Sequence, residues 1–152
     1  MRSLLVPGSP DRLAATLAAH IHRTSRDPRK DAVEAGSSWG RELARRTGRP
    51  EPAGDAGARR QVVRLLDEVG FAPEADEALM TARLTRCPLL DTAKEFPDVV
   101  CGVHLGIVRG ALEEYGAGGS RTSLVPFAEP GACLLHLVPE GGDLVPEGGE
   151  RP

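Results

Sequence analysis

Two glycines four residues apart, Gly36 and Gly40, surround Trp39, the only tryptophan, in the segment DAVEAGSSWGRELARR. The rest of this segment has the pattern of a helix, in which residues four apart lie on one face. Glycine inside a helix costs stability relative to alanine, so a repeated glycine needs a compensating reason. Close approach of another backbone supplies one. The sequence therefore predicts tight packing of the glycine face, either inside the domain or across a homodimer.

A first helix is predicted near the N-terminus. Ser9 can cap it, and Pro10 takes the first helical position, where proline is tolerated. Leu13, Leu17 and Ile21 repeat at a spacing of four residues, which predicts that they form its buried side.

The pattern changes from helical to strand period after residue 70. Two helices are predicted at 31–46 and 58–70, the second ending on Gly70, with a loop at 47–58 between them. A hairpin follows at 71–87, with 78–86 as its second strand, and then a short helix at 89–96 that Pro97 ends. The remaining elements are a helix capped by Asp98 and antiparallel strands at 122–128 and 132–138. Helices first and strands later indicate an α+β fold. N-terminal helices should pack on an antiparallel sheet, with the helix carrying Cys101 and His104 inserted between strands.

One domain is expected from 152 residues, spanning 9–138, after an N-terminal extension at 1–8. The tail at 139–152 contains LVPEGG for the second time and has nothing to bury, so it should be disordered. The absence of a signal peptide and of a long apolar run predicts a cytoplasmic protein with no membrane association.

Three cysteines, Cys87, Cys101 and Cys133, are the leading candidates for chemistry. His104 follows Cys101 by three residues, so on a helix both share a face. His136 follows Cys133 by the same interval, but on a strand that interval puts them on opposite faces, which makes His136 a poorer ligand. Three thiolates with one imidazole suit an iron–sulfur cluster or zinc almost equally. The alternative is that the cysteines act as small buried hydrophobes.

Two other classes of function are open. Trp39, Phe71 and Phe127 could line a pocket for an apolar molecule, with the cysteines merely packing. Cys101 with His104 as base could form an enzyme nucleophile. A helical pair three residues apart rarely has productive geometry without an orienting carboxylate, so no enzyme is expected.

Four segments carry a family resemblance: EAGSSWGREL, LLDEVGFAPEAD, CPLLDTAKEFPDVVCGVHLGIVRGALEEYGA and SLVPFAEPGACLLHL. Together they resemble the C-terminal sensory domain of bacterial ArsR-type winged-helix regulators, a group that includes the iron–sulfur-dependent repressors of the suf operon. The resemblance covers about residues 9–138. It implies a transcriptional sensor in which Cys87, Cys101 and Cys133 ligate an iron–sulfur cluster. More distantly, the chain resembles 4-vinyl reductase-type small-molecule-binding domains.

Members of that family carry a winged helix-turn-helix ahead of this domain, whereas only MRSLLVPG precedes the first helix here. Eight residues cannot form a DNA-reading module. We therefore expect no specific DNA binding by this chain. A homodimer, or a mixed dimer with a full-length regulator, is the expected assembly.

Overall fold

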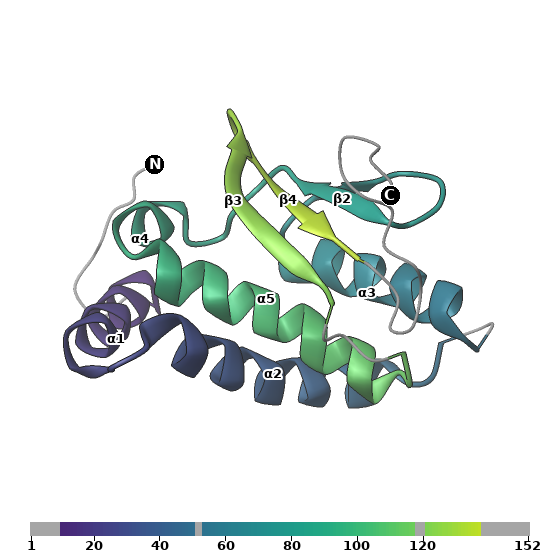
Figure 1. The fold of residues 1–152 in the computed structure, drawn as a ribbon, viewed down its shortest axis with the longest axis horizontal. Helices are drawn as coiled ribbons and strands as arrows, with labels where there is room; N and C mark the ends of the chain where they lie inside the picture. Colours follow the sequence, from purple (N-terminus) through teal and green to yellow (C-terminus); the bar gives the residue numbers. More distant parts are fainter. Residues whose placement is uncertain (1–9, 51–52, 118–120, 138–152) are drawn as a thin grey trace, which may run out of the picture.

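The computed structural model describes residues 10–50, 53–117 and 121–137, and within them it shows an α+β fold (Figure 1). The elements are α1 (Pro10–Thr24), α2 (Pro28–Thr47), α3 (Asp55–Val69), β1 (Pro73–Ala75), β2 (Thr81–Leu84), α4 (Leu90–Glu95), α5 (Pro97–Glu114), β3 (Ser123–Glu129) and β4 (Ala132–His136). The predicted class is confirmed. Ser9, the extension at 1–8 and the tail at 139–152 lie outside the described residues.

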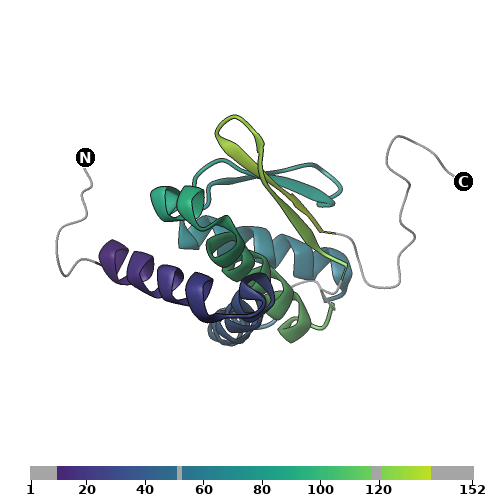
Figure 2. The ribbon, with the colours of Figure 1, turned by 60° about the vertical axis from the view of Figure 1, so that its left-hand side comes forward.

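Helix α5 is the centre of the molecule. Figures 1 and 2 both show it between α2 on one side and the sheet on the other. The sheet is antiparallel, with its strands in the order β1-β2-β4-β3. Along the chain α5 falls between β2 and β3, as predicted for the helix that carries Cys101 and His104. Its position explains why most of its residues are buried.

The glycines bring the backbones of α2 and α5 together. The contact is reciprocal, because a Cβ added to any of four glycines would collide with a carbonyl of the other helix: Gly36 with Val103, Gly40 with Ile107, Gly106 with Val33, and Gly110 with Ser37. No pair of helices in the described part of the chain makes a larger contact. The predicted close packing is confirmed, and it lies inside the domain.

The ends of the helices follow local capping chemistry. The Asp27 carboxylate accepts a hydrogen bond from the Lys30 amide at 3.1 Å, so α2 begins at Pro28, three residues earlier than predicted. Gly70 ends α3 in the left-handed conformation, as predicted. The prediction that Asp98 caps α5 is wrong. Phe96 holds that position without a side-chain bond, because Pro97 both ends α4 and opens α5.

Helix α1 packs differently from its pattern. Leu13 is 61% exposed and Leu17 is 53% exposed, so the prediction that they face the core is wrong. Ala18 is buried instead, and it packs with Ala32 and Val99. Ile21, the third residue of the predicted buried side, is partly buried against the same cluster, so α1 packs through Ala18 and Ile21 while Leu13 and Leu17 stay exposed.

Strands β2 and β4 are shorter than their patterns. The Asp76 carboxylate accepts hydrogen bonds from the amides of Met80 at 2.8 Å and Thr81 at 3.2 Å. The turn between β1 and β2 therefore extends to Met80, and β2 begins at Thr81 rather than at residue 78. Strands β3 and β4 lie within two residues of their predicted bounds.

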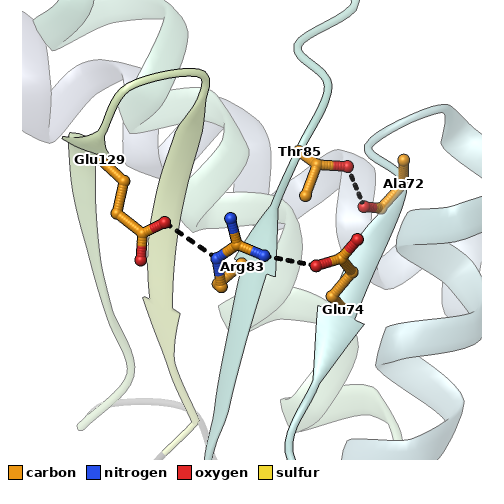
Figure 3. Close-up of polar contacts among 5 residues, drawn as sticks. All are labelled: Ala72, Glu74, Arg83, Thr85 and Glu129. Carbon is orange, nitrogen blue, oxygen red and sulfur yellow. Dashed lines mark hydrogen bonds and ion pairs between the residues drawn. The ribbon is translucent and has the colours of Figure 1, made fainter.

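The outer face of the sheet carries a charged ladder centred on Arg83 of β2 (Figure 3). Its Nε donates to Glu129 Oε1 at 2.9 Å, and its guanidinium also pairs with Glu74 of β1. Thr85 donates to the Ala72 carbonyl at 2.7 Å. Exposed pairs of this kind add little stability, so the ladder chiefly marks the solvent side of the sheet.

We expect Gly36→Leu and Gly40→Leu each to lower the free energy of unfolding by about 1–3 kcal/mol, because overpacking forces the two backbones apart. Ala35→Leu is the matched control, since Ala35 lies on the exposed side of the same helix. Urea denaturation measures the difference. Glycine variants as stable as the control would show that the α2–α5 approach is not close.

Candidate functional site

A cavity of about 620 Å³ lies beside α5. Its walls come from α1, α2, α5 and the segments that follow α3 and precede α4. No charged side chain lines it within the described residues; the lining includes Leu17, Trp39, Phe71, Leu89, Val103 and His104. Leu17 and Trp39, which is 47% exposed, are the lining side chains with the most solvent contact, so they border the opening. The volume and apolar walls are typical of small-molecule sites.

The three aromatic residues predicted to form one pocket do not stay together. Trp39 and Phe71 both line the cavity. Phe127 lines a separate pocket of about 330 Å³, together with Cys87 and Cys133. The register of β3 and β4 shifts between Val125 and Glu129, and Phe127 takes a positive φ of 53° there. At this bulge Phe127 lines the pocket of Cys87 and Cys133 and not the cavity, and no local sequence pattern predicted the bulge.

His104 supplies the polar group of the cavity wall. Its ring meets Phe71 edge to face, with centroids 4.5 Å apart. Burial lowers the pKa of His104 to about 4, so the imidazole is neutral near pH 7. A neutral imidazole offers one donor and one acceptor nitrogen.

The three cysteines gather around the hydrophobic core between α5 and the sheet. Cys101 is a buried member of this cluster, and the half-buried Cys87 and Cys133 pack against it. Burial, with smaller contributions from the neighbouring Cys133 and Cys87, raises the pKa of Cys101 to about 12. The thiols are therefore close enough to influence one another's ionisation. Cys101 itself remains a protonated thiol near pH 7, which makes it a poor nucleophile.

The gathered cysteines do not form a ready metal site. Within the described residues, no group of three or more His, Cys, Asp or Glu side chains is placed to hold a metal ion. His104 lies in the cavity wall, and burial alone lowers its pKa, with no contribution from a cysteine. The ligand set of Cys87, Cys101, Cys133 and His104 is thus only partly assembled.

Cys133 and His136 lie on opposite faces of β4, as their odd separation predicts. Cys133 pairs with Leu84, and its sulfur accepts a hydrogen bond from the Phe127 amide at 3.4 Å. His136 pairs with Thr81 of β2, one position beyond the pair of the buried Leu135 with Ala82. The sheet therefore keeps His136 away from the thiols.

The cavity and the pocket lined by Cys87, Phe127 and Cys133, called here the thiol pocket, are lined in part by consecutive residues. Pro88 and Leu89 line the cavity, whereas the preceding residue, Cys87, lines the thiol pocket. Burial raises the pKa of Cys87, and a backbone hydrogen bond from Leu89 partly offsets that rise. The two sites are therefore connected by adjacent residues, Cys87 and Pro88.

Sequence reasoning missed most of the cavity wall. Ala18 and Val103, for example, come from α1 and α5 and had no role assigned. No local signal in the sequence distinguishes these positions from ordinary residues of a packed helix.

Comparison with protein-family models, with curated proteins and with solved structures found no match to this chain. Among the described helices, none combines the length and apolar character that crossing a membrane requires.

Acid should destabilise the fold through His104. In the unfolded chain the pKa of histidine is near its ordinary value of 6.5, and in the folded chain it is about 4. The unfolded state therefore binds the proton more readily in this window, so stability falls as the pH drops from about 6.5 to about 4. The shift corresponds to at most about 3 kcal/mol.

His104→Leu should flatten this part of the pH dependence, measured as the free energy of unfolding in urea at about pH 7, 5.5 and 4. His20→Leu, at an exposed position of α1, serves as the control and should follow the wild-type curve. Parallel curves for His104→Leu and the wild-type chain would contradict the assignment.

Proposed function

We propose that this chain is a sensory module that binds an apolar small molecule in the cavity between α1, α2 and α5. The observation that carries the proposal is the cavity itself, about 620 Å³ in volume and free of charged lining residues in the described part of the chain. Burying an apolar molecule there removes its surface and that of the walls from water, which is favourable.

The packing of α1 supports a sensory role. Helix α1 is held by a narrow contact around Ala18, and it contributes Leu17 to the mouth of the cavity. A bound ligand would add contact area between α1 and α5 and so favour one position of α1. In the regulators that the sequence resembles, the DNA-binding domain precedes this helix. Occupancy would then be transmitted through α1, in a homodimer or in a mixed dimer with a full-length regulator.

Ala14→Phe is the sharpest test of the cavity. Ala14 lines it, and a phenylalanine there would occupy part of its volume. Ala15→Phe is the matched control, because Ala15 is equally half-buried on the same helix but does not line the cavity. Nile red, an uncharged apolar dye, is the probe.

We expect the wild-type chain and Ala15→Phe to bind Nile red, with enhanced dye emission and a change in Trp39 fluorescence. Ala14→Phe should weaken binding about tenfold or more, the effect of losing roughly 1.4 kcal/mol of contact energy. Equal binding by both variants would place the dye elsewhere, and no binding by the wild-type chain would remove the proposal.

Metal or cluster ligation by Cys87, Cys101 and Cys133 is the second candidate. The gathering of all three thiols on one core cluster favours it, as does the resemblance to iron–sulfur-dependent repressors. An iron–sulfur cluster or zinc would displace the protons of the thiols, including the one on Cys101 that burial retains. The sulfurs would also have to draw closer than in the structure, with His104 or an external group completing the set.

Anaerobic purification followed by visible spectroscopy and metal analysis tests this candidate. A cluster predicts broad visible absorption that Cys133→Ser abolishes and that Ala14→Phe leaves intact, because only the first variant removes a ligand. A colourless chain with one zinc per molecule, also lost in Cys133→Ser, would identify zinc. A colourless chain without metal would leave the cysteines as packing residues.

A further inference from the structure

We infer that the cavity selects an uncharged hydrophobic molecule with one hydrogen-bonding group, of the phenol or alcohol class, and that His104 recognises that group. This inference rests on the proposed function and adds the chemical class of the ligand and its specificity-determining residue.

The walls favour a neutral ligand. A charged group entering the cavity would lose its hydration, and none of the described lining residues carries a charge to compensate. Only two lining side chains, His104 and Trp39, contain polar atoms. Trp39 is nearly half exposed at the mouth, whereas His104 lies deeper, against Phe71. The polar end of a ligand is therefore expected at His104.

The imidazole of His104 is available for that contact. It forms no hydrogen bond with any described residue, and its known partner is the Phe71 ring. Thr122 Oγ1 is the one side-chain polar atom in the described residues that is sealed from solvent without a partner. The nitrogens of His104, which make no hydrogen bond with a described residue, are therefore not sealed from solvent, and the residue lines the cavity.

The state of the imidazole sets the class of ligand. With a pKa near 4 it is neutral near pH 7, so it can accept a hydrogen bond from a hydroxyl group or donate one to it. A carboxylate could accept only the single N–H of the neutral imidazole, and no described lining residue carries a charge to offset its desolvation, which opposes binding. A pure hydrocarbon would leave the nitrogens without a partner and cut off from water.

Three probes with the same apolar body test the inference: 4-tert-butylphenol, tert-butylbenzene and 4-tert-butylbenzoate. They differ in carrying a hydroxyl group, no polar group and a carboxylate. Isothermal titration calorimetry measures their affinities for the full chain near pH 7. We expect the phenol to bind about 3- to 10-fold more tightly than the hydrocarbon, the ratio typical of one hydrogen bond, and the benzoate to bind most weakly.

Variants locate the preference. His104→Leu should abolish the preference for the phenol while the hydrocarbon still binds. His104→Gln, which retains a donor and an acceptor, should keep part of it and guards against loss by misfolding. His20→Leu, at an exposed position of α1 outside the cavity, is the control and should leave the preference unchanged.

The outcomes separate the two proposals. Equal binding of phenol and hydrocarbon, a preference that survives His104→Leu, or tightest binding of the benzoate would overturn this inference while the cavity remained a binding site. Failure of all three probes to bind the wild-type chain would instead remove the proposed function with it.

Discussion

The close contact between the backbones of α2 and α5 is the constraint on which the rest of the structure depends. Gly36 and Gly40 on one helix face Gly106 and Gly110 on the other, and each lacks the Cβ that would hold the helices apart. Helices that approach so closely have little room for side chains between them. Larger residues must therefore point away from the α2–α5 contact, toward the sheet on one side and toward α1 on the other.

This arrangement divides α5 into two working faces. Cys101 and Leu105 belong to the core shared with the sheet, where the other two cysteines also lie. Val103 and Ile107 form part of the cavity wall, together with His104. Residues three positions apart on α5, such as Cys101 and His104, thus have different surroundings, although helical spacing alone puts them on one side. The close contact between α2 and α5 decides which residues of α5 face the thiols and which face the cavity.

The sequence predicted what depends on local chemistry. The glycine contact, the α+β order, the end of α3 at Gly70 and the opposite faces of Cys133 and His136 follow from backbone sterics and from the periods of helix and strand. Prediction from the sequence failed where tertiary packing decides which face of an element is buried. Leu13 and Leu17 have a core-like spacing, but α1 lies on the domain through Ala18, and a period cannot reveal how large the partner surface is.

The same limit applies to the candidate site. Trp39 and Phe71 come together because α2 and the end of α3 both lie beside α5, whereas the bulge in β3 takes Phe127 elsewhere. Nothing in the sequence indicated that residues 87–89 connect the two sites. Pro88 and Leu89 line the cavity, and Cys87, held by a hydrogen bond from Leu89, lines the thiol pocket. A shift of this segment on ligand binding would alter the surroundings of Cys87 directly. The cavity and the thiols therefore meet at consecutive residues of one segment of the chain.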